Sequence, residues 1–154
     1  MSPRKKVGRE AAIAAPAHGR PIRAAYYYRT RWGTHDEFVD LFVRNHWPIL
    51  RAQKETGRIL DVTLEVPRFH GDGRADWDVL VTITWRDWAA IEEHSDPTIT
   101  SRLFPDDEAH AAEERRRFSL LEAHWDVPLQ SVALPDAADA AAAATPGRGA
   151  RSRR

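Results

Sequence analysis

The segment LDVTLEVPRFHGDGRADWDVLVTITW, residues 60–85, decides the fold of this chain. Apolar and polar residues alternate on both sides of Gly71 and Gly73, which is typical of two β-strands joined by a turn. Such alternation predicts a sheet that packs on one face only. The other face carries Asp61, Thr63, Glu65, Asp78, Leu80, Thr82 and Thr84. This second face meets either water or a ligand cavity, and the function depends on which of the two it meets.

The same alternation predicts how the two strands pair. Opposed residues of an antiparallel pair share a face, and their residue numbers add up to a constant. The apolar residues are even-numbered on the first strand and odd-numbered on the second, so this sum of residue numbers must be odd. A sum near 145 pairs Leu64 with Val81 and Thr63 with Thr82. Pro67 has no N–H to give to a neighbouring strand, and it therefore places the first strand at an edge of the sheet.

Five further elements are expected around this hairpin. They are a strand over 22–31, a helix over 35–56, a helix over 88–94, a helix over 105–124 and a final strand over 126–134. Residues 98–104 fit either a short helix or a loop. With short connections and right-handed crossovers, this β-α-β-β-α-β order predicts an α+β fold, the ferredoxin-like sandwich. Its four-stranded antiparallel sheet has the order 4-1-3-2, with the helices on one face.

Single residues mark the ends and bends of the helices. Pro48 is expected to kink or split the first helix, and Gly57 to end it. Thr34 and Glu37 have the spacing of a capping box, and Asp87 is the expected cap of the next helix. The run Arg115–Arg117 is interpreted as a solvated helix face.

Composition sets the limits of the folded domain. All fourteen aromatic residues lie between Tyr26 and Trp125, so we expect the domain to span 21–134. Residues 1–20 carry five basic side chains against one Glu, a net charge of +4, and residues 135–154 carry four Arg against two Asp, a net charge of +2. Both are expected to be disordered basic tails. Because the whole chain is neutral, the domain carries −6, which argues against nucleic-acid binding.

The chain has no cysteine and no run of about 20 apolar residues, the length of a membrane span. We therefore expect a cytoplasmic protein that does not bind membranes. No spacing typical of a zinc or iron site is present in the sequence, so no metal is expected.

Several segments together resemble the dimeric α+β barrel superfamily. These are YYYRTR at 26–31, WGTHDEF at 32–38, HWPIL at 46–50 and the pattern W-x-V-x-V-T-x-x-W-R-D-W at 77–88. The superfamily includes antibiotic-biosynthesis-type monooxygenases, EthD-like and NIPSNAP-like proteins, muconolactone isomerases and polyketide cyclases. The resemblance covers residues 22–134 and implies a homodimer in which two open sheets pack face to face around a cavity. A single sheet covered on one side agrees with such a C₂ dimer.

The polar face of the sheet supplies the candidate site residues. Asp78 or Glu65 is expected as the base, with Arg29 as an electrostatic partner and His46 near the mouth of the barrel. The expected ligand-binding residues are Tyr27, Asp61, Thr63, Leu80, Thr82 and Trp47. Tyr26 and Tyr28 are assigned to the helix-covered face. In the alternative interpretation Arg29 pairs with Glu65 or Asp61 on a wetted sheet, and His46 packs under a bent helix.

Aromatic-rich walls favour flat apolar ligands. Taken with this preference, the resemblance implies a cofactor-independent enzyme (a monooxygenase, cyclase or isomerase) that holds an aromatic or polyketide-like molecule and acts by proton transfer or oxygenation. The alternative is a non-catalytic ligand-binding or structural dimer. No cofactor is expected, although relatives by fold that bind haem make His46 and His94 candidate axial ligands.

Overall fold

The structure, a computed structural model, describes residues 19–69, 76–93 and 95–132. Residues 1–18 of the expected N-terminal tail, the whole expected C-terminal tail, the hairpin turn at 70–75 and His94 lie outside the described residues. The expectations made for them stay predictions.

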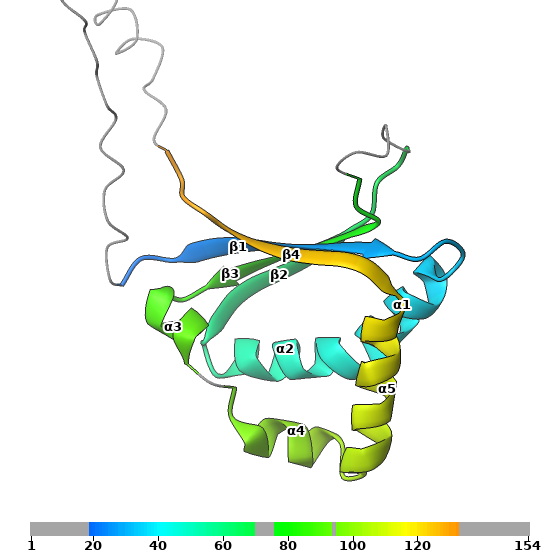
Figure 1. Ribbon diagram of the computed structural model, residues 1–154. Helices are drawn as coiled ribbons and strands as arrows, with labels where there is room; N and C mark the ends of the chain where they lie inside the picture. The colour runs from blue at the N-terminus through cyan, green and yellow to red at the C-terminus, as the bar shows by residue number, and fades with distance from the viewer. Residues whose placement is uncertain (1–18, 70–75, 94, 133–154) are drawn as a thin grey trace, which may run out of the picture.

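One four-stranded antiparallel sheet carries all the helices on one of its faces (Figure 1). The strand order β2-β3-β1-β4 is the predicted one, and the predicted α+β, ferredoxin-like βαββαβ architecture is confirmed. The elements are β1 Ile22–Thr30, α1 His35–Leu41, the π-helical turn η1 Phe42–His46, α2 Trp47–Glu55, β2 Ile59–Glu65, β3 Val79–Trp85, α3 Trp88–Glu92, α4 Pro97–Leu103, α5 Asp107–Ser119 and β4 Leu121–Leu129. Residues 98–104, left between helix and loop, thus belong mostly to α4.

The register of the hairpin also agrees with the prediction. Leu64 pairs with Val81 and Thr63 with Thr82. Strand β2 lies at one edge of the sheet, as predicted, but it ends at Glu65, so Pro67 lies beyond the strand and not within it. A shift by one residue would have exchanged the two faces, so the apolar pattern was sufficient to determine the pairing.

The first long helix is divided as Pro48 predicted. Because proline has no N–H to give to the preceding turn, the regular helix is interrupted there, and a π-helical turn joins α1 to α2. This turn directs Asn45, which is buried, towards α5, where its side-chain amide donates a 2.8 Å hydrogen bond to Glu113. Gly57 follows α2 with φ = +76°, as expected of a residue that ends a helix.

Strand β4 starts earlier than predicted. It spans Leu121–Leu129 rather than 126–134, because α5 ends at Ser119 and not at His124. The pairing of Thr30 with Leu121, next to an irregularity in the register, sets the start of β4 against β1. Gln130 and Ser131 follow the strand.

The two predicted helix caps have opposite outcomes. The capping box does not form, because the Thr34 hydroxyl donates to the carbonyls of Arg31 and Leu120 while Glu37 pairs with Arg116. The predicted cap Asp87 is confirmed by its 2.8 Å hydrogen bond from the Ala90 N–H.

The core lies between the sheet and the helices. Side chains of β3 pack there against α1, η1 and α2, and the fully buried members include Phe38, Phe42, Val79 and Val81. One charged residue lies among them. Arg117, expected on a solvated face, is only 1% exposed, whereas Arg115 and Arg116 are exposed. Within the described ranges, no helix has the length and apolar character needed to cross a membrane.

Candidate functional site

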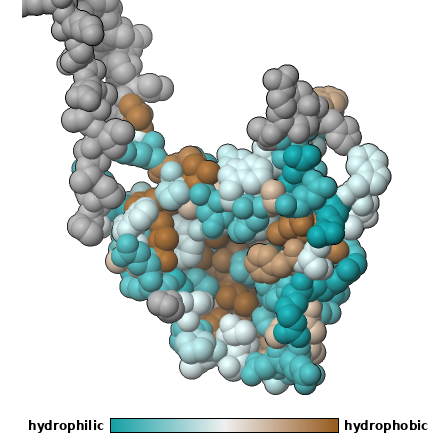
Figure 2. All heavy atoms as spheres, in the orientation of Figure 1, coloured by the Kyte–Doolittle hydropathy of each residue, from teal (hydrophilic) through white to brown (hydrophobic). Residues whose placement is uncertain are grey.

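Two hollows are formed by the described residues. The end pocket, about 790 Å³, lies beside the β1–α1 turn and is lined by residues of that turn and of the segments that flank 70–75. The cleft, about 440 Å³, lies between the helix-covered face of the sheet and α2, α4 and α5. Figure 2 shows the cleft as a hollow lined by hydrophobic atoms, below the sheet and between α5 and the α3–α4 side.

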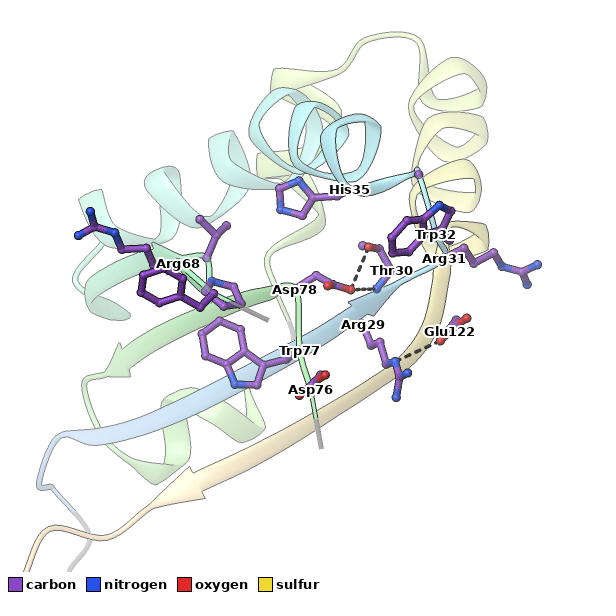
Figure 3. A pocket seen from close by; sticks show the side chains of 14 residues that line it. Arg29, Thr30, Arg31, Trp32, His35, Arg68, Asp76, Trp77, Asp78 and Glu122 are labelled. Atoms are coloured by element: carbon purple, nitrogen blue, oxygen red, sulfur yellow. Dashed lines mark hydrogen bonds and ion pairs between the residues drawn. The ribbon is translucent and has the colours of Figure 1, made fainter. Parts of the chain in front are cut away.

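Two charged residues of the end pocket, Arg29 and Asp78, are engaged with neighbouring groups (Figure 3). Arg29 pairs with Glu122 at 3.1 Å. Asp78 accepts hydrogen bonds from the backbone N–H of Thr30 at 2.7 Å and from its hydroxyl at 3.0 Å. These bonds hold the end of β1 against the start of β3. Trp32 lies at the rim and is 95% exposed.

The cleft has an apolar floor made by three elements. Val81 and Ile83 come from β3, Leu50 from α2 and Phe42 from η1. Polar side chains surround this floor in three groups, near α5, along β4 and near α3. This combination of apolar walls and a few placed polar groups is what small-molecule sites share.

The first polar group joins η1 to α5. Glu114 accepts two hydrogen bonds from Arg117, at 2.9 and 2.6 Å, and lies 3.9 Å from Nδ1 of His46. Burial, helped by the nearby Arg117 charge, lowers the pKa of His46 to about 4, so its imidazole is neutral at physiological pH. Burial acts to raise the pKa of Glu114, but the bonds from Arg117 outweigh it and lower this pKa, so the carboxyl is ionised.

The second polar group lies on β4 and is the arrangement best suited to chemistry. His124 and Asp126 share the helix-covered face because they are two residues apart on a strand. Nε2 of His124 lies 2.9 Å from the Asp126 carboxylate, and its ring stacks on Tyr28 at 4.4 Å between centroids. A carboxylate at Nε2 selects the tautomer with the proton there, which leaves Nδ1 of the neutral ring able to accept a proton.

The third polar group surrounds Tyr26 and Trp85. The indole N–H of Trp85 donates a 3.1 Å hydrogen bond to the Tyr26 hydroxyl oxygen. The guanidinium of Arg58 lies 5.2 Å from the centre of the Trp85 ring and is itself held by the Ala90 carbonyl and the Gln53 side chain. Tyr26 and Tyr28 therefore face the helices, as the sequence predicted.

The opposite face of the sheet, here called the open face, holds most of the predicted ligand-binding residues. It is lined by Arg23, Ala25, Tyr27 and Arg29 of β1, Asp61, Thr63 and Glu65 of β2, Leu80, Thr82 and Thr84 of β3, and Ala123, Trp125, Val127 and Leu129 of β4. Tyr27 stacks on Trp125 at 5.3 Å and meets Trp77 edge-on at 5.9 Å. Predicted residues thus do gather on this face.

The predicted catalytic residues do not converge on one point. Glu65 is exposed at the edge of the open face, and Arg29 pairs with neither Glu65 nor Asp61 but with Glu122. The side chain of Lys54 hydrogen-bonds Asp61 at 3.1 Å and thereby lowers the pKa of that carboxyl. Asp78 is held by Thr30, as described above. Catalytic roles for these residues stay predictions.

Two predicted residues lie on the helix side. His46 faces the cleft rather than the open face, whereas Trp47 packs against the core. His46 is also the described candidate for an axial haem ligand, and its Nδ1 is already directed at Glu114. Among the residues that the structure describes, no group of three or more acidic, His or Cys side chains could hold a metal ion.

Sequence reasoning missed the side chains around the cleft for two reasons. His124 and Asp126 were assigned to a helix end and a strand start, so their shared face was hidden. Arg117 was grouped with Arg115 and Arg116, although Glu114 lies three residues before it on the same helix face. The alternation from Leu121 to Asp126 was the available signal for β4.

No protein-family model and no curated protein matches this chain. A hypothetical protein of Arabidopsis thaliana, solved in solution, superposes with a TM-score of 0.51 over 79% of this chain and 96% of that one, at 7% identity. The fold is ferredoxin-like. A dimeric ferredoxin-like protein of unknown function from Thermobifida fusca superposes with a TM-score of 0.48 at 13% identity, over 73% of this chain and 92% of that one. SnoaB, a cofactor-independent oxygenase from Streptomyces nogalater that was solved as a mutant, superposes with a TM-score of 0.45 at 14% identity. The match covers 75% of this chain and 98% of SnoaB.

The ferredoxin-like fold agrees with the resemblance noted from the segments at 26–31, 32–38, 46–50 and 77–88. At these identities the likeness concerns the architecture, and the chemistry must be argued from the side chains of this chain.

Proposed function

We propose that this protein binds a flat small molecule in the cleft and moves a proton on it without a cofactor. The observation that carries the proposal is the His124–Asp126 pair, with the imidazole stacked on Tyr28 at the edge of an apolar hollow. A base oriented by a carboxylate is a recurring arrangement in proton-transfer enzymes. The reaction is an isomerisation, a cyclisation or the deprotonation that begins an oxygenation.

The shape of the cleft supports a flat ligand. Its walls include the rings of Tyr28, Phe42, Trp85 and Phe118, and a volume of about 440 Å³ is ordinary for a small-molecule site. Aromatic rings stack well on planar molecules. His46 is the second functional residue that we propose there. Its pKa of about 4 makes it a weak base, so it acts as a neutral hydrogen-bonding group that orients the ligand.

Binding in the cleft can be tested by blocking it. Thr100 on α4 lines the cleft, whereas its exposed neighbour Ser101 does not. We expect Thr100→Trp to weaken the binding of bicyclic and tricyclic phenols and quinones by about tenfold or more, a loss of about 1.4 kcal/mol. Ser101→Trp should change the affinity less than about twofold. Isothermal titration calorimetry measures both, and equal affinities in the two variants would place the ligand elsewhere.

We also infer that the protein is a homodimer whose two open faces pack together. The described open face presents the aromatic group Tyr27, Trp77 and Trp125, and beside it Val127 and Leu129 are 37% and 42% exposed. A second copy of the same face shields these side chains from water in a two-fold arrangement.

The dimer has a simple test. Trp125→Glu places two like charges near each other across the two-fold interface, so we expect it to shift the full-length protein from dimer to monomer at micromolar concentration. Val43→Glu, at a half-exposed apolar residue of η1 on the helix side, is the control and should remain dimeric. Light scattering reports both masses, and a wild-type monomer would refute the inference.

A further inference from the structure

The hydroxyl of Tyr26 has a proton that no acceptor uses within the described part of the chain. The indole nitrogen of Trp85 can only donate, so the Tyr26 oxygen accepts in their 3.1 Å hydrogen bond. Burial raises the pKa of Tyr26, which keeps the phenol protonated. Because Tyr26 lines the cleft, its O–H is a donor available to a ligand there.

The surroundings of Tyr26 hold this donor in place. Arg58 lies over the Trp85 ring, and its guanidinium donates to the carbonyls of Ala90 and Glu93 and to the side chain of Gln53. The cation is therefore held beside the indole whose N–H points at the Tyr26 oxygen. A fixed donor backed by a second donor and a positive charge is suited to an oxygen that gains negative charge.

The strand pairing relates Tyr26 to the proposed base. Tyr26 lies opposite Asp126, and Tyr28 lies opposite His124, on the same face of the sheet. Two residues along a strand span about 7 Å. This is the spacing of the two backbone positions, and a ligand with a C=O group beside an acidic C–H is long enough to contact both side chains, with a hydrogen bond of about 2.8 Å to its oxygen.

We propose that Tyr26 is a catalytic residue that stabilises the oxyanion of an enolisable ketone, or of a phenol, held in the cleft. The inference rests on the proposed function and names its substrate class. His124 takes the proton from the carbon beside the carbonyl, the C–H electron pair forms a C=C bond, and the carbonyl π pair becomes a negative charge on the oxygen bonded to Tyr26. When the ketone is β,γ-unsaturated, the enolate is a conjugated dienolate, and return of the proton from His124 to its γ carbon completes an isomerisation. Trp85 and Arg58 are positioning residues.

Naphthols of graded acidity are suitable probes because their ionised form resembles such an enolate. Absorbance titration of the bound naphthol measures how strongly the full-length protein prefers the ionised form. We expect Tyr26→Phe to reduce this preference about 10- to 100-fold, the effect of losing one hydrogen bond to a charged group. Trp88→Phe is the control, since it also removes a polar hydrogen-bond donor from an aromatic side chain, the indole N–H that Trp88 gives to Glu92, but Trp88 does not line the cleft.

A second variant makes the test independent of any effect of Tyr26→Phe on folding. Trp85→Phe keeps the Tyr26 hydroxyl but removes its indole donor, and we expect a smaller reduction of about 2- to 10-fold. An unchanged preference for the ionised naphthol in Tyr26→Phe, with binding retained, overturns the inference while leaving the proposed function standing. Naphthols that fail to bind the wild type, or that bind equally to Thr100→Trp, overturn the proposed function itself.

Discussion

His124→Gln is expected to slow proton removal from a bound ketone by about 100-fold or more, within the range that general bases contribute. Glutamine fills similar space and can still hydrogen-bond Asp126, but it cannot accept a proton at the Nδ1 position. The measurable reaction is exchange of hydrogen for deuterium beside the carbonyl of a bicyclic ketone such as 2-tetralone, followed by NMR in D₂O. Ligand affinity should change little, so the loss appears in the rate.

His35→Gln is the control for this experiment. His35 also lies beside an aspartate, with Nδ1 3.0 Å from Asp36, but it is outside the cleft. We expect the exchange rate of His35→Gln to match that of the wild type. The exchange rate of Asp126→Asn should fall between those of His124→Gln and the wild type, because this variant keeps the histidine but loses the carboxylate that selects its tautomer. An exchange rate in His124→Gln equal to that of the wild type would exclude His124 as the base.

The largest expected effect on stability comes from Arg117→Met. Arg117 is almost fully buried, donates twice to Glu114 and lies 4.5–5.8 Å from the rings of Phe38, Phe42 and Phe118. Removing it leaves a half-buried carboxylate without its partner. We expect the free energy of unfolding to fall by about 3 kcal/mol, the low end of the range for breaking a buried pair, because Glu114 is partly exposed.

The adjacent Arg116 provides the comparison. Its pair with Glu37, at 2.7 Å, is on the surface, where water and salt screen the charges, so we expect its loss to change the free energy of unfolding much less than the loss of Arg117. Urea unfolding measures the loss in the free energy of unfolding for both Arg116→Met and Arg117→Met. Adding Glu114→Leu to Arg117→Met should recover part of the loss, since the unpaired carboxylate is then removed. Similar values for the two single variants would show that Arg117 is not the buried residue of the run.

The sequence predicted the fold where a local pattern had one consistent solution. The alternation on both hairpin strands allowed one register. Strand β2 does lie at the predicted edge of the sheet, although it ends before Pro67, the residue on which that prediction rested. Pro48 correctly marked the interruption between α1 and α2. The start of β4 was missed, because residues 120–125 are compatible with a helix end as well as with a strand. Pairing with β1, a contact distant in sequence, decided between them.

For the candidate site, too, local patterns predicted one part and contacts between distant elements decided the other. The sequence by itself determined which residues alternate on β1, β2 and β3, and therefore that Tyr27, Thr63, Leu80 and Thr82 share one face. Only the tertiary structure decided that a cleft opens on the opposite side. It forms because β4 places His124 and Asp126 beside β1, and because α5 buries Arg117 against Glu114 and leaves Arg116 on the surface. Burial and the charge of a neighbour depend on packing between distant elements, which no local pattern encodes.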